Sequence, residues 1–398
     1  MFTLAMIGLY RVGAHVPVPG VNVSQIADQV QNTAALGLLN LFSGGALEQF
    51  AVFSLGIMPY ITSSIIMQLL QGVVPKIEQW AKEGETGQRK ITQITRYMTL
   101  GIAFLQAIGF LSIFRQTLNM PLNFISGAVI VITLIAGTAL IMWMGELITQ
   151  RGIGNGMSLL IFASIVARFP ATVISSFTLG NAFWVVILLL LTVLVVAAIV
   201  TMERGQRRVP VQYAKRVVGR KVYGGAGTYI PFKLNAANVV PIIFASAILF
   251  FPSQVLALWP GAPQAVRDIG DMLAKGWLHN TLYFVLIIFF TYFYTALIFN
   301  PIDLADNLRK NGGFIPGVRP GSATVRYIEN VINRLTLPGA VFLGVIALGP
   351  TLLFAFTDVQ LLQAFGGTSI LIMVGVALET MTQLESQLKM RHYEGFFK

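Results

Sequence analysis

Ten stretches of mostly apolar residues constrain the fold of this chain more than any other feature of its sequence. A helix needs about 20 predominantly apolar residues to cross the hydrocarbon core of a bilayer. The sequence therefore predicts an all-α, polytopic membrane protein with ten transmembrane helices. The stretches lie at 1–16, 51–73, 97–114, 125–148, 156–168, 182–202, 236–258, 281–299, 336–356 and 368–388, and those at 1–16 and 156–168 are short.

Composition supports this class. Hydrophobic residues make up 55% of the chain and charged residues only 11%, against roughly a quarter charged in a typical soluble domain. So few charges cannot cover a soluble protein of 398 residues, and lipid must cover much of the surface. The absence of Cys excludes disulfides, thiolate metal sites and cysteine nucleophiles.

The first residues, Met1 to Ala14, are apolar enough to be mistaken for a signal peptide. They have no basic region before them and no small-residue cleavage site after them. We expect them to form a first spanning helix whose start lies close to, or beyond, the start of the sequence.

The orientation follows from Lys and Arg, which collect in cytoplasmic loops. Of the 27 Lys and Arg residues, 22 fall in one alternate set of connections and 4 in the other, and Arg11 lies inside the first expected helix without an evident partner. This asymmetry predicts a multi-pass membrane protein with both termini cytoplasmic. The basic set comprises 74–96, 149–155, 203–233, 300–335 and 389–398.

Ten helices with both termini on one side fit two halves of five helices. We place the halves at 1–181 and 182–398. Because each half crosses the membrane an odd number of times, any structural duplication would be inverted. The second half holds two long cytoplasmic loops, 203–233 and 301–335, and connections of this length suggest a docking role.

Short motifs spread along the chain carry a resemblance to a known family. No single motif is decisive, but their number and order make chance agreement implausible. They are FSGGAL at 42–47, GIMPYI at 56–61, RGIGNG at 151–156, ERGQRR at 203–208, FNP at 299–301, ADNL at 305–308, PGVRPG at 316–321 and FGGTS at 365–369. The chain resembles the SecY family, the channel subunit of the bacterial Sec translocon. It departs from the family mainly at its start, where the cytoplasmic segment before the first helix is missing.

The resemblance implies a function and partners. The chain would be a channel, not an enzyme, that translocates unfolded secretory polypeptides and releases membrane segments laterally into lipid. A cytosolic motor ATPase or the ribosome would drive it, and it would need no cofactor or metal. Its partners would be small SecE-like and SecG-like subunits, the SecA motor, the ribosome, signal sequences and unfolded preproteins, and anionic lipid.

The resemblance also assigns a pore ring of aliphatic side chains, which would hold back ions because a narrow apolar constriction sheds water. Ile57 and Ile61 are four residues apart, as are Met157 and Ile161, so each pair shares one helix face. Ile residues in spanning helices otherwise face lipid or pack, and the residues alone leave both readings open. The ring would comprise Ile57, Ile61, Met157, Ile161, Ile243 and Ile372.

Two further sites follow from the resemblance. The external segment near 41–50, with Phe42, Ser43, Gly44 and Gly45, would be a plug, a short helix folded back beneath the ring; without the family, an apolar surface loop is the simpler reading. Polar residues within apolar helices would form a lateral gate that a signal sequence parts, although permanent helix packing fits them equally well. This polar cluster would comprise Thr62, Gln106 and Asn235.

The basic loops would receive the motor or the ribosome, and anionic lipid is the simpler partner for such clusters. Arg319 lies among Pro and Gly residues that predict a turn directed toward the cytoplasm. The contact residues would be Arg204, Arg207, Arg208, Lys215, Arg216, Arg220, Arg319 and Tyr393.

Three other functions compete with the channel. A secondary transporter usually keeps charged residues near the bilayer midplane, whereas here the ionisable residues of the helices, apart from Arg11, lie mostly toward their ends. An intramembrane enzyme fits less well, since His15, His279 and His392 are far apart in the sequence and show no metal-ligand spacing. Composition does not exclude a third function, that of a binding scaffold with no transport activity.

The orientation is testable because the chain has no Cys. Single cysteines placed at Ser43 and at Gly321 should react with an impermeant maleimide from opposite sides of the membrane. Labelling of both positions from the same side would overturn the predicted orientation.

Overall fold

The computed structural model describes residues 1–19, 21, 26, 30, 40, 42–114, 124–179, 182–213, 216–218, 221–223, 228–258, 263–264, 268, 270, 272–273, 276–357 and 367–394. A helix lies within or across each of the ten predicted apolar stretches. In this part of the chain, six helices are long and apolar enough to cross a membrane, and three further apolar helices are shorter. The chain is therefore a mostly helical protein with several membrane-spanning segments.

The helices that occupy the ten stretches are α1 (Phe2–Gly13), α4 (Met58–Val73), α6 (Glu85–Ile113), α7 (Phe124–Arg151), α8 (Gly156–Leu179), α9 (Ala182–Arg204), α10 (Val240–Leu258), α12 (Trp277–Ile298), α14 (Ser322–Thr357) and α16 (Gly367–Glu394). Two shorter helices, α5 (Pro75–Lys82) and α13 (Pro301–Lys310), lie in predicted cytoplasmic segments.

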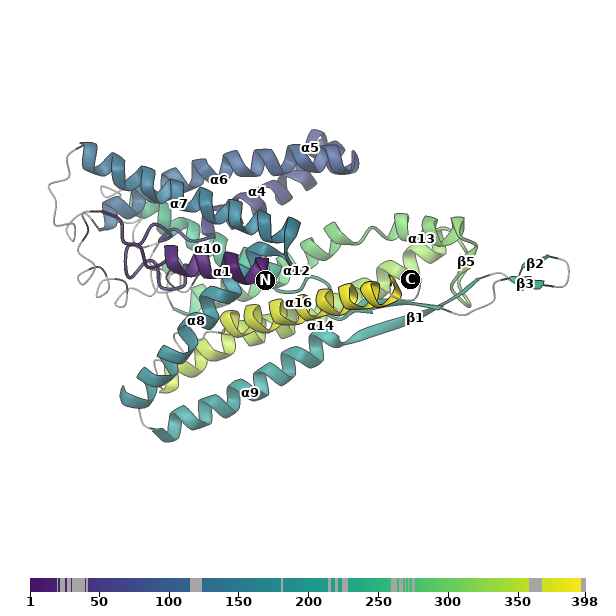
Figure 1. Ribbon diagram of the computed structural model, residues 1–398. Coiled ribbons are helices and arrows are strands. Elements are labelled where there is room, and N and C mark those ends of the chain that lie inside the picture. Colours follow the sequence, from purple (N-terminus) through teal and green to yellow (C-terminus); the bar gives the residue numbers. More distant parts are fainter. Residues whose placement is uncertain are drawn as a thin grey trace.

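The long helices form two packed groups that meet along two seams (Figure 1). In the first group α4 packs against α6, α6 against α7 and α7 against α8. In the second group α10 packs against α12, α12 against α14, and α14 against α16. Helix α16 also contacts α9. The groups touch where α10 meets α4 and α6, and again where α8 meets α16 and α9.

The RGIGNG motif makes the sharp turn between α7 and α8. The Asn155 side chain caps α8 by accepting hydrogen bonds from the backbone N–H of Met157 at 3.1 Å and of Ser158 at 3.4 Å, as Asn does at helix starts. A Cβ on Gly156 would lie 1.9 Å from the Gly145 carbonyl oxygen of α7. Only Gly therefore allows the start of α8 to lie this close to α7.

Five strands extend the protein beyond one end of the helices, at the right of Figure 1. β1 (Gln206–Tyr213) pairs with β4 (Thr228–Lys233) from Gln206–Lys233 to Val211–Thr228, and with β5 (Gly313–Phe314) through Gln212–Phe314 and Tyr213–Gly313. β2 (Arg216–Val218) and β3 (Lys221–Tyr223) form a separate hairpin. The sheet order β4-β1-β5 joins loop 203–233 to loop 301–335.

These strands correct the expectation of an all-α fold. Val209 and Val211 are buried and alternate with exposed residues along β1, which is the two-residue period of a strand with one covered face. They pack in a second apolar core with Phe232 of β4, Leu308 of α13 and Ile328 of α14. The two loops therefore form one folded unit outside the helical body.

Candidate plug, pore ring and loop surface

The segment from Phe42 to Ile57 folds inside the helical body. Leu47, Phe50 and Ala51 are fully buried. The segment pairs with the chain that follows α1 through two backbone hydrogen bonds, from Val18 N to Phe50 O and from Val52 N to Val16 O, each 2.9 Å. An apolar surface loop, the simpler reading of these residues, would not be buried in this way.

The local structure of this segment differs from the expected short helix, because residues 43–50 form successive turns. Gly44 and Gly45 have φ of 68° and 90°, and Phe50 has φ of 41°. This left-handed region is open to Gly but disfavours other L-residues, and it interrupts a right-handed helix. The predicted Gly44 and Gly45 thus shape the turns of the segment.

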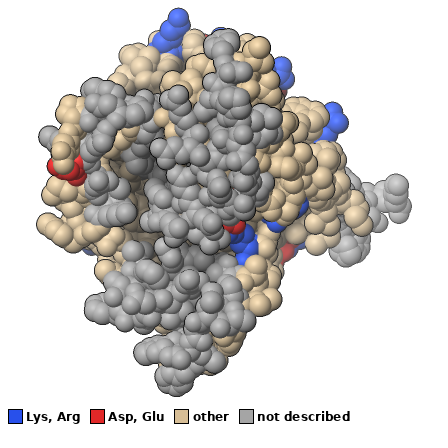
Figure 2. Space-filling model, turned by 90° about the vertical axis from the view of Figure 1, so that its left-hand side faces the viewer, with Lys and Arg blue, Asp and Glu red and all other residues tan. Residues whose placement is uncertain are grey.

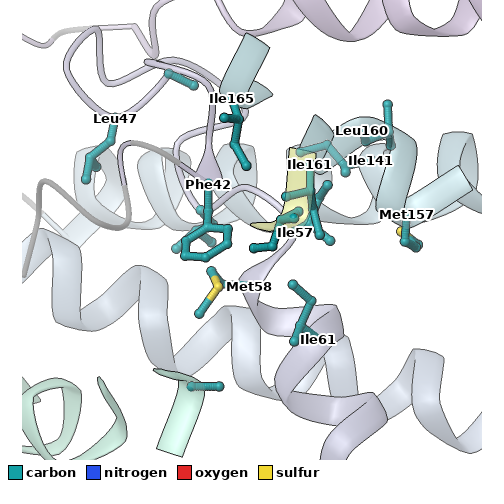
Figure 3. Packing of buried hydrophobic residues seen from close by; sticks show 14 of the residues in the cluster. Phe42, Leu47, Ile57, Met58, Ile61, Ile141, Met157, Leu160, Ile161 and Ile165 are labelled. Carbon is teal, nitrogen blue, oxygen red and sulfur yellow. The ribbon is translucent and has the colours of Figure 1, made fainter. Parts of the chain in front are cut away.

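The six predicted ring residues come from four helices. Ile57 and Ile61 lie at the start of α4, Met157 and Ile161 on α8, Ile243 on α10 and Ile372 on α16. All except Ile243 are buried, and Ile243 is partly buried against the same apolar cluster. Figure 3 shows Ile57 and Ile161 directed into this cluster, which also contains Phe42 and Leu47.

The segment of turns touches the ring through the GIMPYI motif. A Cβ on Gly56, whose φ is 57°, would lie 3.2 Å from Ser43 Cα and 3.5 Å from the Phe42 carbonyl oxygen. Gly56 directly precedes Ile57. The backbone at Phe42 and Ser43 therefore packs on the residue that places Ile57.

Two side chains of α1 anchor the same segment, and the sequence did not single them out for this role. The Tyr10 hydroxyl lies 3.2 Å from the Ser43 carbonyl oxygen and 2.7 Å from Ser164 Oγ on α8. Arg11 Nη1 donates a hydrogen bond to the Gly44 carbonyl oxygen at 2.9 Å. Arg11, for which the sequence indicated no partner, therefore binds the segment of turns.

Few of the described residues at the end of the molecule opposite the sheet are charged. Figure 2 views the end of the molecule opposite the sheet, and Lys, Arg, Asp and Glu are sparse among its described residues. Low charge suits the external side inferred from the distribution of Lys and Arg.

Of the three predicted gate residues, Thr62 and Asn235 make described hydrogen bonds, and these have different partners. Thr62 Oγ1 donates to the Met58 carbonyl of its own helix at 3.0 Å, and Gln106 is buried on α6. Asn235 Nδ2 donates to Glu203 Oε1 at 2.6 Å and to the Asn238 carbonyl at 3.1 Å. These two bonds of Asn235 join the end of α9 to the entry of α10.

The surroundings of Asn235 explain why it lies there. The Leu234 N–H donates to the Gly205 carbonyl at 2.9 Å, and a Cβ on Gly339 of α14 would lie 2.7 Å from the Leu234 carbonyl oxygen. Asn235 is itself 2% exposed. The base of the β1–β4 hairpin is thus clamped between α9, α10 and α14.

The predicted loop contacts lie on the extended sheet and its neighbouring turn. Arg204, Arg207 and Arg208 are exposed, and the Arg208 guanidinium lies 4.7 Å from the Tyr229 ring centroid. Arg319 is exposed in a turn between Gly317, with φ of 80°, and Gly321, with φ of 111°. Arg216 lies on β2 and Tyr393 in α16, while Lys215 and Arg220 lie outside the described residues.

Metal ligands were not expected. Within the described part of the chain, no three His, Asp or Glu side chains are grouped to hold a metal ion.

The geometry defines a class: a multi-pass helical membrane protein whose helices meet around buried Ile and Met side chains, with a segment of turns packed into them. The family model described as SecY matches residues 51–381. The chain belongs to the SecY family, whose members are translocation channels and not enzymes.

Similar proteins of known sequence support this family assignment. The chain is 48% identical over 423 residues to the protein translocase subunit SecY of Streptomyces scabiei and 45% identical over 424 residues to that of Mycobacterium tuberculosis H37Rv. Each alignment covers 100% of this chain and 96% of the relative.

Solved structures share the fold. A structure described as "The structure of a protein conducting channel" matches with a TM-score of 0.63 and 18% identity, over 97% of this chain and 91% of that one. Sec61 in the canine ribosome-channel complex from the endoplasmic reticulum matches with a TM-score of 0.59, 18% identity and the same coverage.

Replacing Asn235 by Leu tests the role that its contacts indicate. The substitution removes the hydrogen bond to the partly buried Glu203 carboxyl group, and leaving such a group without its partner costs about 1–3 kcal/mol. We expect a lower thermal unfolding temperature in detergent. Thr133→Val is the control, because Thr133 bonds only the Val129 carbonyl of its own helix among the described contacts. If stability is unchanged but the export of defective signal sequences is altered, the result would instead support a role for Asn235 in the lateral gate.

Proposed function

We propose that this chain is the channel through which unfolded secretory polypeptides cross a bacterial plasma membrane. Family membership and the protein-conducting fold support it. The observation that carries the proposal is that the Ile and Met side chains from four helices belong to one apolar cluster, which also contains Phe42 and Leu47 of the segment of turns.

In this proposal ten helices span the membrane as two inverted halves, 1–181 and 182–398, with the pore between them. The two seams between helix groups support this division, because α10 meets α4 and α6 on one side and α8 meets α16 and α9 on the other. Both termini are cytoplasmic, in keeping with the 22 Lys and Arg residues of the basic connections.

The ring residues seal the resting channel. Aliphatic side chains offer no hydrogen bonds to hold a passing polypeptide, and a narrow apolar constriction excludes water and ions. Residues 41–50 act as the plug on the external side of the ring. The contact of Phe42 and Ser43 with Gly56 supports this assignment.

The lateral gate lies where α10 meets α4 and α6. Thr62 on α4 and Gln106 on α6 belong to this seam by their helices. When an apolar signal sequence inserts between these helices, its contacts with them replace their contacts with each other. A membrane segment can then pass through the opened seam into the lipid. Interhelical hydrogen bonds in membranes contribute about 0.6–2 kcal/mol each, so such a seam can open reversibly.

The folded cytoplasmic unit receives the driving partner, the SecA motor or the ribosome. Sec61 and Ssh1, two proteins of the same fold, occur in solved complexes with ribosomes. Exposed Arg side chains on β1 and in the Arg319 turn provide the charge for an acidic or phosphate surface. Small SecE-like and SecG-like subunits complete the channel within the membrane, and anionic lipid binds the remaining basic residues.

The seal is tested by replacing Ile57 and Ile243 together with Ser. Hydroxyl groups should wet the constriction and raise the resting ion conductance of reconstituted channels. Ile132→Ser makes the same chemical change at a position of α7 that is 65% exposed to the surroundings of the protein, and should leave the conductance at background. Background conductance in the double variant, with translocation intact, would show that these residues do not form the seal.

The docking role of Arg319 is tested by Arg319→Lys, which keeps the charge but loses the guanidinium fork. A lost hydrogen bond to a charged group is worth about 1.5–3 kcal/mol, so motor-driven export should fall by about tenfold or more. Membrane insertion and stability should stay normal. Arg326→Lys, at an exposed position on α14, is the control. Unimpaired export in Arg319→Lys would show that Arg319 serves only as one of the positive charges that keep the loop cytoplasmic.

A further inference from the structure

The plug turn lies between two arginine side chains from two different helices. On the α1 side, Arg11 Nη1 donates to the Gly44 carbonyl oxygen, and a Cβ on Gly44 would lie 3.0 Å from the same nitrogen. On the α8 side, Arg168 Nε would lie 3.9 Å from a Cβ on Gly45. The two glycines therefore also leave room for the guanidinium groups.

Arg168 makes a further contact of a different kind. Its Nη2 lies 2.7 Å from Glu48 Oε1, so the pair is both a salt bridge and a hydrogen bond. Glu48 belongs to the plug, and its own N–H donates to Asn40 Oδ1 at 3.2 Å. This ion pair joins the plug to a helix that carries two ring residues, Met157 and Ile161.

The surroundings of the pair make it more than a surface contact. The side chains of Arg168 and Glu48 are 28% and 22% exposed, whereas those of the surface pair Lys82–Glu78 are 74% and 54% exposed. Exposed pairs contribute little to stability. Removing one partner of a largely desolvated pair leaves the other charge uncompensated, and this costs much more.

We propose that the Arg168–Glu48 ion pair is a latch that positions the plug in the resting channel. This inference rests on the proposed function, in which residues 41–50 are the plug. Arg168 stays on α8, and Glu48 leaves with the plug when the channel opens. The plug cannot move away from the ring without separating this pair, so the pair sets the fraction of channels that conduct at rest.

The test is a double-mutant cycle on reconstituted channels without preprotein, using Glu48→Gln, Arg168→Gln and the double variant. Each single variant should raise the resting conductance about tenfold, which corresponds to about 1.4 kcal/mol. Both single variants break the same contact, the Arg168–Glu48 ion pair. The double variant should therefore conduct no more than either single variant. Glu78→Gln, the same change in the surface pair, should leave the conductance unchanged.

A second measurement does not depend on conductance. Ser43 is 1% exposed, so a cysteine at this position should react slowly with an externally added impermeant maleimide. In the Glu48→Gln background the labelling rate should rise about tenfold, since the plug leaves its site more often. Equal labelling rates with and without Glu48→Gln, or conductance effects of the two single variants that multiply in the double variant, would overturn the latch.

A chain in which a Gly-Ser linker of equal length replaces residues 42–50 separates this proposal from the proposed plug. Raised conductance in the linker chain, with no change in Glu48→Gln, would overturn the latch and keep the plug. Background conductance in both the linker chain and Glu48→Gln would overturn the assignment of residues 41–50 as the plug.

Discussion

The structure depends on apolar packing among buried side chains from α4, α8, α10 and α16, which belong to one cluster. A protein-conducting channel must admit polar, irregular chains when active and exclude ions at rest, and aliphatic side chains meet both demands. Ile57, Ile161 and Ile372, from α4, α8 and α16, are each at most 3% exposed. The two helix groups touch where α10 meets α4 and where α8 meets α16, and the segment of turns packs against Gly56. Any opening must first separate these contacts.

Polar contacts lie around this apolar centre and connect it to the rest of the chain. On the side of the proposed plug, Tyr10 and Arg11 bind the backbone carbonyls of Ser43 and Gly44. On the loop side, Asn235 joins α9 to the entry of α10, and β1 pairs with both β4 and β5. A partner that binds the sheet therefore acts on a unit joined to α10, which carries Ile243 of the proposed ring and packs on α4 and α6.

The sequence predicts the helices well, because apolar length in a bilayer leaves few alternatives. The caps of α8 and α13, Asn155 and Asn300, are residues of the type that helix starts prefer. Contacts between distant segments are harder to predict. The pairing of β1 with β5 joins residues about a hundred positions apart, and only the alternation of Val209 and Val211 indicates a strand locally. The partners of Arg11 and Asn235, and the turns of the plug, depend on backbone geometry that no residue pattern specifies.

The central claim is that polypeptide passes between the ring residues, and the absence of Cys makes this directly testable. A preprotein stalled in transit and carrying one cysteine would be oxidised with channels bearing Ile161→Cys, in the ring, or Ile132→Cys, on the exposed face of α7. The account predicts a disulfide with position 161 and none with position 132. A disulfide at position 132 alone, or at neither position while the preprotein remains protected in transit, would contradict it.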